Sequence, residues 1–175
     1  MTGFRIRKAG ADDCDALSLV GCAAFVETFT GILPGSDIVA HCAEKLSPGA
    51  FRQLLAVGGE AWLVELAKTG KPIGYALLTK PDLPLETAAG DRELRRIYFL
   101  KRAQGTGAAG QLLGEIVAAL RAAGSTRLLL GVYRGNHRAC AFYERYGFVV
   151  VGERQYRVGA NSYDDLVYAL DLEPS

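Results

Sequence analysis

The stretch that decides the fold runs from residue 104 to residue 110 and reads Gln104-Gly105-Thr106-Gly107-Ala108-Ala109-Gly110. From Gly105 onward it is a GxGxxG motif, in which the glycines let backbone N–H groups approach an anion closely. The apolar residues that follow recur at helical spacing, namely Leu112, Leu113, Ile116, Val117 and Leu120. A helix that opens directly after the glycines adds the positive end of its dipole, so the stretch predicts a pyrophosphate site.

The glycines alone do not say which pyrophosphate ligand binds, since NAD, FAD, ATP and coenzyme A all present such a group. A Rossmann fingerprint should open the first βαβ unit and precede an acidic residue by about 20 positions. Here the motif begins at residue 105 of 175, and the next strand-like run, 127 to 134, carries no acid. A P-loop needs Lys and Ser or Thr where this chain has Gln111 and Leu112. Both nucleotide interpretations are therefore disfavoured.

Composition points to one folded domain over residues 1 to 175. The net charge of +1 gives no basic footprint for nucleic acid, and 50% hydrophobic with 22% charged residues is typical of a soluble protein. No apolar run is long enough to cross a bilayer, and the N-terminal residues lack a signal-peptide core. We expect a cytoplasmic protein with neither a nucleic acid nor a membrane as partner.

Cysteines and histidines give no sign of a metal site. The four cysteines, Cys14, Cys22, Cys42 and Cys140, lack CxxC spacing, so we interpret them as buried thiols and expect no metal. His41 and His137 each lie alone in a helical stretch, which favours a structural or surface role.

Periodicity and turn residues give the order of elements. They predict strands at 4–7, 61–66, 73–78, 93–100, 127–133, 148–158 and 162–170. They predict helices from Asp12 or Asp13 to Phe29, at 36–46, at 50–57 after a Ser47-Pro48 cap, from the glycine turn to Gly124, and at 136–146. Because one helix separates strands 93–100 and 127–133, we expect these strands to be parallel within a mixed α/β sheet. A ligand would bind at their carboxyl ends, beside the glycine turn.

Two segments together resemble the GCN5-related N-acetyltransferase (GNAT) family. Gln104, Gly107 and Ala109 are similar to its Q/R-x-x-G-x-G/A signature, with an aliphatic strand (residues 94–100) before it and Leu112-Leu113 after it. The second segment comprises Asn136, Ala139, Phe142-Tyr143-Glu144 and Gly147-Phe148. The resemblance in motifs and element order covers about residues 60 to 170 and is far more specific than the glycines alone.

The resemblance implies a central, strongly twisted mixed sheet, flanked by helices, in which two parallel strands splay apart to admit acetyl-CoA. Backbone groups of Ile97, Tyr98 and Phe99 would pair with the pantetheine arm, as an added strand does. The amides of Gln104, Gly105, Thr106, Gly107, Ala108, Ala109 and Gly110 would hold the pyrophosphate. An N–H near Tyr98 or Phe99 would polarise the thioester carbonyl. Asn136 would bond the pantetheine arm, cap the following helix, or do both.

Acetyl transfer to an amine also needs a proton donor for the thiolate and a base for the ammonium. The resemblance implies that Tyr143 is the donor, although its place on the apolar stripe of its helix also fits a core aromatic. Glu93 is our first candidate for the base, acting directly or through water, and Glu27 and Asp12 are further candidates. Trp62 and Tyr75 are expected to pack the sheet.

The acceptor is predicted less directly. The segments around Glu27-Thr28-Phe29 and in the last hairpin resemble PaiA-type polyamine acetyltransferases, which predicts a small-molecule polyamine acceptor with Glu27 and Phe29 at its site. Peptide or protein N-termini, aminoglycosides and amino acids stay open as acceptors, as does a non-catalytic acyl-CoA-binding regulatory module. Dimers are common in the family, so monomer and homodimer both stay open.

Overall fold

The centre of the structure is one sheet of seven strands in the spatial order β1-β2-β3-β4-β5-β7-β6. The computed structural model describes residues 3 to 172. The strands are β1 (Phe4–Ala9), β2 (Glu60–Leu66), β3 (Pro72–Thr79), β4 (Asp91–Phe99), β5 (Arg127–Tyr133), β6 (Val149–Val158) and β7 (Asn161–Asp171). Within these residues β4 and β5 form the one parallel pair, and all other neighbours are antiparallel. The predicted mixed sheet is thereby confirmed.

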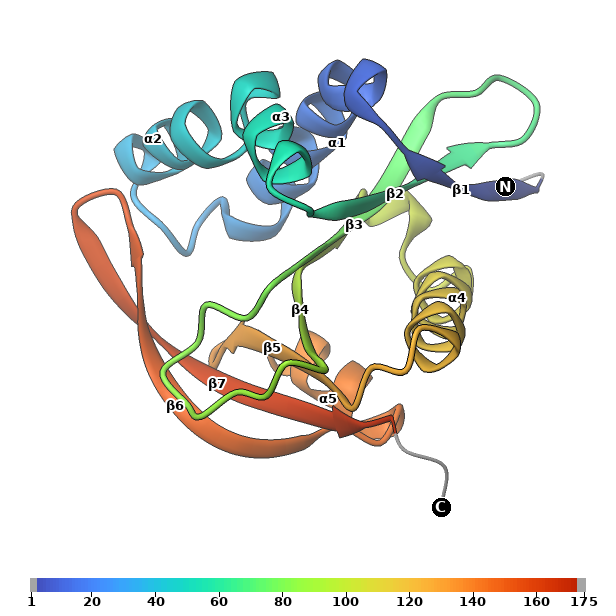
Figure 1. Ribbon diagram of the computed structural model, residues 1–175. Helices are drawn as coiled ribbons and strands as arrows, with labels where there is room; N and C mark the ends of the chain where they lie inside the picture. Colours follow the sequence, from blue (N-terminus) through green and yellow to red (C-terminus); the bar gives the residue numbers. More distant parts are fainter. Residues whose placement is uncertain (1–2, 173–175) are drawn as a thin grey trace.

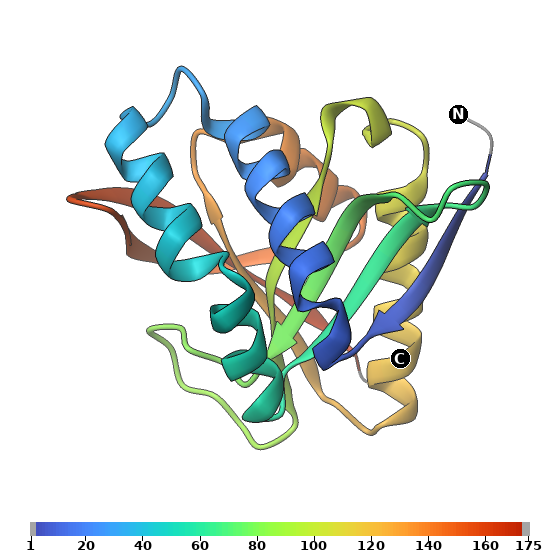
Figure 2. The same ribbon diagram turned by 90° about the horizontal axis from the view of Figure 1, so that it is seen from above.

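Helices cover both faces of this sheet (Figure 1, Figure 2). One face carries α1 (Cys14–Phe29), α2 (Gly35–Lys45) and α3 (Pro48–Ala56), and the other carries α4 (Ala108–Ala122) and α5 (His137–Arg145). Two short 3-10 turns, η1 (Ala11–Asp13) and η2 (Lys101–Ala103), precede α1 and follow β4. No helix in the described part of the chain combines the length and the apolar character that crossing a bilayer requires.

The central strands are apolar at nearly every position because both of their faces are covered. In β2, Ala61 and Leu63 belong to the core cluster under α1, α2 and α3, whereas Trp62 and Val64 belong to the cluster under α4 and α5. The side chains thus alternate between two cores. The continuous apolar run in the sequence therefore results from burial on both faces of the strand.

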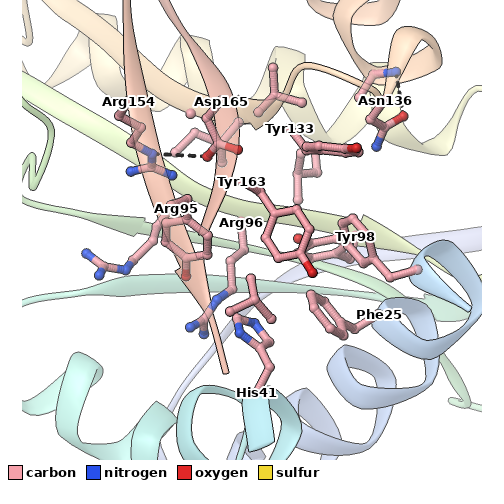
Figure 3. A pocket seen from close by; sticks show the side chains of 18 of the residues that line it. Phe25, His41, Arg95, Arg96, Tyr98, Tyr133, Asn136, Arg154, Tyr163 and Asp165 are labelled. Carbon is pink, nitrogen blue, oxygen red and sulfur yellow. Dashed lines mark hydrogen bonds and ion pairs between the residues drawn. The ribbon is translucent and has the colours of Figure 1, made fainter. Parts of the chain in front are cut away.

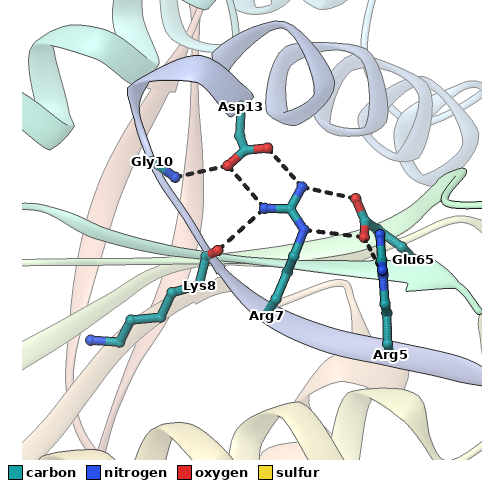
Figure 4. A network of polar contacts seen from close by, with 6 residues as sticks. All are labelled: Arg5, Arg7, Lys8, Gly10, Asp13 and Glu65. Carbon is teal, nitrogen blue, oxygen red and sulfur yellow. Dashed lines mark hydrogen bonds and ion pairs between the residues drawn. The ribbon is translucent and has the colours of Figure 1, made fainter.

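Arg7 joins β1 to β2 and to the start of α1 (Figure 4). Its guanidinium donates to Asp13 at 2.9 and 2.7 Å and to Glu65 at 3.1 and 2.9 Å, and Nη1 also donates to the Lys8 carbonyl at 3.3 Å. Arg5 donates to Glu65 at 2.8 Å. Hydrogen bonds from Arg7 are the main reason that the pKa values of Asp13 and Glu65 are lowered. This network fixes how the first strand and helix join the sheet.

Strands β4 and β5 are paired only where they begin. Their pairs in register are Asp91 with Arg127, Arg92 with Leu128 and Glu93 with Leu129. The buried Asp91 carboxylate accepts hydrogen bonds from Arg127 Nε at 3.0 Å, Arg127 Nη2 at 2.5 Å and the Thr126 hydroxyl at 3.1 Å. Beyond Glu93 the two strands diverge, while β5 stays paired with β7 along its length. Beyond Glu93, the edge of β4 that faces β5 therefore has no described strand beside it.

On its other edge β4 carries a β-bulge. The register with β3 shifts by one residue between the pairs Leu77–Arg96 and Leu78–Leu94, which makes Arg95 the extra residue. Leu94 packs under α4, whereas Arg96 lies over the Phe51 ring of α3. In an uninterrupted strand positions 94 and 96 would share one face. The bulge therefore turns Arg96 and the side chains after it toward new faces.

The predicted order of helices and strands is confirmed, with shifts at the ends. Ser47 caps α3 as expected, since its hydroxyl accepts a hydrogen bond from the Ala50 N–H at 3.2 Å. β4 starts at Asp91, two positions before the predicted start, because its contact with Arg127 crosses a long segment that periodicity does not register. The expectation of buried thiols holds for Cys14 and Cys140 but is wrong for two others, Cys22 and Cys42, which are half-buried.

Replacing Asp91 by Asn should destabilise the protein by about 2 kcal/mol, because it removes the buried negative charge and exchanges one of the two acceptor oxygens for an NH2 donor. Because the Arg127 side chain is partly exposed, solvent screens its charge and limits the loss of stability. Hydrogen bonds from Arg127 lower the pKa of Asp91 in the folded protein. Its contribution is therefore complete above the unfolded pKa of about 4 and is lost as pH falls through the folded pKa. Urea unfolding at several pH values should show the difference shrinking below about pH 4.

Glu115→Gln is the matched control, because Glu115 is exposed on α4. Its unfolding free energy should stay within about 0.5 kcal/mol of the parent protein. Equal stability of Asp91→Asn and the parent at neutral pH would show that the Asp91 contact does not hold the two strands together.

Candidate active site

A groove opens where β4 and β5 separate. Its volume is about 770 Å³, within the range of about 300–1,000 Å³ that small-molecule and cofactor sites occupy. Ile97, Tyr98 and Phe99 of β4 form one wall, and the remaining walls come from the turn before α4 and from α5. The groove therefore joins the gap in the sheet to the N-terminus of a helix.

The turn before α4 presents a row of free backbone N–H groups. Gly105 and Gly107 have φ values of +77° and +87°, which side chains other than glycine rarely tolerate. The Gln111 N–H donates to the Gly107 carbonyl at 3.0 Å, and in the described chain the N–H groups of residues 105 to 110 have no acceptor. The Gln104 N–H instead donates to the Lys101 carbonyl at 3.1 Å, so this cradle begins at Gly105. Free N–H groups at a helix N-terminus favour a phosphate ligand.

Gln104 contributes through its side chain. Nε2 donates to the Phe99 carbonyl at 3.1 Å, and Oε1 accepts a hydrogen bond from the Arg138 guanidinium. Gln104 thereby links the end of β4 to the start of α5. Lys101, Arg138 and Arg145 also line the groove and bring positive charge that suits phosphate groups.

The third glycine of the motif has a packing role. A Cβ atom at Gly110 would lie 1.9 Å from the Tyr146 hydroxyl oxygen. Glycine at this position therefore leaves room for the Tyr146 side chain to lie against the start of α4 beside the groove.

The open edge of β4 and the start of α5 supply polar groups to the groove. Backbone N–H and C=O groups alternate between the two edges of a strand, so some of those in Ile97, Tyr98 and Phe99 point away from β3 into the gap. Across the gap, Asn136 caps α5 by accepting a hydrogen bond from the Ala139 N–H at 3.2 Å. Its Nδ2 has no protein acceptor among residues 3 to 172, which leaves an amide donor for a ligand.

Tyr143 lines the groove from α5. Its ring packs against Phe142, Phe148 and Tyr168 at centroid distances of 5.4, 5.5 and 6.2 Å, so the core-aromatic interpretation is correct for the ring. Its hydroxyl makes no hydrogen bond within the described residues. Burial raises the pKa of Tyr143, so the hydroxyl keeps its proton at neutral pH.

A second cavity of about 110 Å³ lies beyond the gap (Figure 3). Since one water needs about 10–15 Å³ by this measure, it has room for roughly seven to eleven water-sized groups. Its walls come from α1, α2, β4, β5 and the β6–β7 hairpin. The residues common to both spaces are Ile97, Tyr98, Asn136, Ala139 and Tyr143. The groove and the cavity therefore meet where β4 and β5 separate.

Glu93 is a buried carboxylate in the cavity wall. It accepts a hydrogen bond from the Asp82 N–H at 2.7 Å and lies 4.0 Å from one nitrogen each of Arg95 and Arg154. Burial raises the pKa of Glu93, and these contacts only partly offset it. A carboxylate with a raised pKa is a stronger base, which suits a group that accepts a proton from an ammonium.

Arg154 fills the space between the hairpin and β5. Its Nε donates to the buried Asp165 at 3.0 Å, and its guanidinium lies 4.7 Å from the centroid of Tyr156 (Figure 3). A Cβ atom at Gly131 would lie only 2.4 Å from Arg154 Nη2. Glycine on β5 thus allows the guanidinium to rest on the strand backbone. Burial raises the pKa of Asp165, and the Arg154 cation opposes this.

Arg96 and His41 lie on the side of the cavity away from Asn136 (Figure 3). Arg96 is 7% exposed, has no carboxylate partner in the described part of the chain, and has no hydrogen-bond partner for Nη1. His41 stacks on Phe25 at 4.2 Å. Burial lowers the pKa of His41 to about 4, and the Arg96 cation adds to this, so the imidazole is neutral at physiological pH.

Asp37 holds the β6–β7 hairpin over the cavity. This buried carboxylate at the start of α2 accepts hydrogen bonds from the Ala160 N–H at 3.3 Å, Asn161 Nδ2 at 2.6 Å and the Tyr163 hydroxyl at 3.5 Å. Figure 1 shows the hairpin reaching α2. The hairpin side chains that line the cavity are therefore held in place by a helix from the first third of the chain.

The structure brings together most of the residues that the sequence singles out. Phe29 and Glu93 line the cavity, and Asn136 and Tyr143 line both spaces. Glu27 lies outside both, and its carboxylate accepts a hydrogen bond from the Lys101 N–H at 2.6 Å.

Asp12 is exposed in η1 and lines neither space, while Trp62 and Tyr75 are core residues as expected.

Sequence reasoning missed several groups in the cavity. Arg96 and Asp165 were not singled out, and His41 was assigned only a structural or surface role. A charged residue inside an apolar strand, such as Arg96, was the one available signal.

Comparison with known proteins decides the family. The model described as the acetyltransferase (GNAT) family matches residues 19 to 148, which include both motifs. The chain belongs to the GNAT family. An uncharacterized N-acetyltransferase of Mycobacterium tuberculosis is 31% identical over 160 residues, covering 91% of this chain and 98% of that relative. This GNAT protein is accordingly an N-acetyltransferase, as the sequence predicts.

Solved structures of GNAT proteins share the fold. The PaiA N-acetyltransferase from Thermoplasma acidophilum, solved in complex with coenzyme A, has a TM-score of 0.78 at 20% identity, over 97% of this chain and 99% of that one. A putative acetyltransferase from Salmonella typhimurium, solved with acetyl-CoA, has a TM-score of 0.72 at 19% identity, over 99% and 96%. The predicted GNAT fold is confirmed, and homologues bind coenzyme A or acetyl-CoA.

Gly107→Ala should weaken coenzyme A binding about tenfold, because a left-handed backbone costs a residue with a side chain roughly 1–2 kcal/mol and the cradle would rearrange to relieve it. Titration calorimetry with coenzyme A measures the change. Gly114→Ala on the same helix is the control, since a Cβ there meets no atom within 4 Å, and its affinity should match the parent. If Gly107→Ala bound coenzyme A as tightly as the parent protein, the result would show that the turn is not part of the coenzyme site.

Proposed function

We propose that this protein transfers the acetyl group of acetyl-CoA to a primary amine of a small molecule. The observation that carries the proposal is the meeting of the groove and the cavity at Ile97, Tyr98, Asn136, Ala139 and Tyr143. A thioester lying in the groove and an amine in the cavity would face each other there.

The groove fits the parts of acetyl-CoA in order. The N–H cradle at residues 105 to 110, with nearby Arg138, suits the pyrophosphate. The open edge of β4 suits the amide groups of the pantetheine arm, which would take the place of the missing strand, and Asn136 offers a further donor. An N–H of β4 near Tyr98 would then stabilise the oxyanion that forms at the thioester carbonyl.

The proposed chemistry uses Glu93 and Tyr143 for the protons. Glu93, directly or through water, takes one proton from the ammonium of the acceptor. The free amine forms a bond to the carbonyl carbon, and collapse of the tetrahedral species breaks the C–S bond. Tyr143 gives its proton to the departing thiolate and is restored by the second proton of the nitrogen. Burial that raises the pKa of the Tyr143 phenol would also raise the pKa of a coenzyme A thiol beside it, which keeps proton transfer from the phenol to the thiolate feasible.

The predicted polyamine acceptor stays a prediction. A polycation needs free carboxylates for its further ammonium groups, yet Glu93 and Asp165 each lie within 4.0 Å of an arginine. We therefore propose the broader class, primary amines of small molecules, and include spermidine and spermine in the test. Peptide N-termini and aminoglycosides serve as larger probes, which a cavity of about 110 Å³ disfavours.

Tyr143→Phe should lower kcat about 100-fold, because general acid catalysis contributes about 10²–10⁴-fold. Release of free coenzyme A from acetyl-CoA is followed with a thiol reagent across the amine panel. Affinity for coenzyme A and the unfolding midpoint are the controls, and both should match the parent since the ring stays in place. Full turnover in Tyr143→Phe would remove the proposed acid. Coenzyme A binding without turnover of any amine would instead support a regulatory module.

A further inference from the structure

The acceptor cavity has one more positive than negative side chain. Arg95, Arg96 and Arg154 line it together with the carboxylates of Glu93 and Asp165. Arg154 is paired with Asp165 at 3.0 Å, and Arg95 lies 3.3 Å from Asp82 and 4.0 Å from Glu93. Of these three cavity-lining arginines, Arg96 is the one with no carboxylate partner within the described residues.

Arg96 is also short of hydrogen-bond acceptors. It is buried, and Nη1 has no partner at hydrogen-bond distance. The Tyr75 hydroxyl is near enough for the guanidinium to oppose the rise in the tyrosine pKa that burial causes, but this hydroxyl carries no negative charge. The Phe51 ring beneath the guanidinium, 5.6 Å from its centre, provides an attractive face but no acceptor. Buried polar groups in native proteins are almost always paired, so a charged exception indicates a partner that the protein chain itself does not supply.

The groups around Arg96 favour an anion. His41 is neutral and makes no hydrogen bond within the described residues, so it adds no competing carboxylate and offers a ring nitrogen. The other titratable groups that the Arg96 charge reaches are Tyr75 and Tyr98, both protonated phenols because burial raises their pKa values. The two carboxylates in the same cavity wall, Glu93 and Asp165, lie beside Arg95 and Arg154 instead of Arg96. A planar guanidinium matches the two oxygens of a carboxylate.

We propose that the acceptor of this enzyme is a small amino carboxylate, whose carboxylate binds Arg96 beside His41 while its amine lies at the junction with the groove. This inference rests on the proposed acetyl transfer and names its substrate class. Figure 3 shows the two ends of the cavity: Arg96 and His41 at one, Asn136 at the other. The cavity volume of about 110 Å³ suits a molecule of this size.

The β-bulge explains how the strand delivers Arg96 to this cavity. Glu93 precedes the extra residue and Arg96 follows it, and the bulge places both in the cavity wall although an odd spacing would otherwise separate them. The same strand thus carries a base for the amine and a cation for the carboxylate.

Matched acceptors that differ in one group test the proposal. Leucine is compared with 3-methylbutylamine, which lacks only the carboxylate, and 4-aminobutanoate is compared with butylamine and 1,4-diaminobutane. At least one carboxylate should have a kcat/KM about 30-fold above its analogue without the carboxylate, with the diamine below both, since a buried charge pair carries discrimination of this order. Equal rates in both pairs, or a preference for the diamine, would overturn the proposal.

Variants separate recognition from structure. Arg96→Met should bring the ratio within each pair close to one. Arg96→Lys, which keeps the charge but loses the planar fork, should retain part of the ratio and covers the case in which Arg96→Met does not fold. Arg92→Met removes a charge from the same strand outside the cavity and should keep the full ratio. A uniform loss for all acceptors in both Arg96 variants would assign Arg96 a structural role and overturn the proposal.

A binding measurement keeps this inference distinct from the proposed function. Calorimetric titration of leucine and 4-aminobutanoate into the complex with coenzyme A should show binding that Arg96→Met weakens about 30-fold, with or without turnover. Binding without thiol release for any amine would contradict acetyl transfer but support the carboxylate site. Thiol release from simple amines, with no binding of either carboxylate, would support acetyl transfer and overturn the site.

Discussion

The parallel pairing of β4 and β5 is the constraint on which the rest of the structure depends. Asp91 and Arg127 hold the two strands together at their first residues, and the pairing ends at Glu93 and Leu129. Because unpaired backbone groups in a covered sheet are unfavourable, the open edge of β4 requires another partner. The gap in the sheet is thus both the structural cost of this fold and the place where, in the proposed function, a ligand with amide groups would gain binding energy.

Two further features place different chemical groups on the two sides of this gap. The glycine turn after β4 brings free N–H groups to one side, where α4 begins, and the bulge at Arg95 turns charged side chains toward the other. Asp37 then fixes the β6–β7 hairpin as a roof over the second side. In the proposed reaction, the donor in the large groove and the acceptor in the small cavity would approach the same point, where the two spaces share five lining residues.

Local features were predictable from the sequence, whereas contacts between distant segments were not. Spacing of apolar residues, the Ser47 cap and the glycine turn each act within a few residues, and all of them were recovered. The placement of Glu93 in the cavity followed from its position before the motif. The bulge at Arg95 could not be predicted, because the alternation of apolar and polar residues is too weak in a strand covered on both faces to reveal an extra residue. Arg96, His41 and Asp37 belong to the site only through packing of segments that are far apart in the chain, and Glu27 was placed at the acceptor by a short resemblance although its carboxylate caps η2.

Hydrogen–deuterium exchange with and without ligand tests the central claim most directly. Coenzyme A should slow exchange in two regions, residues 94–99 on the open edge of β4 and residues 105–110 in the turn, and leave α3 unchanged. NAD, which has the pyrophosphate but no pantetheine arm, should protect residues 105–110 at most. Protection of residues 94–99 by coenzyme A alone is the result that the account predicts. No change in β4 with coenzyme A, or equal protection by NAD, would contradict it.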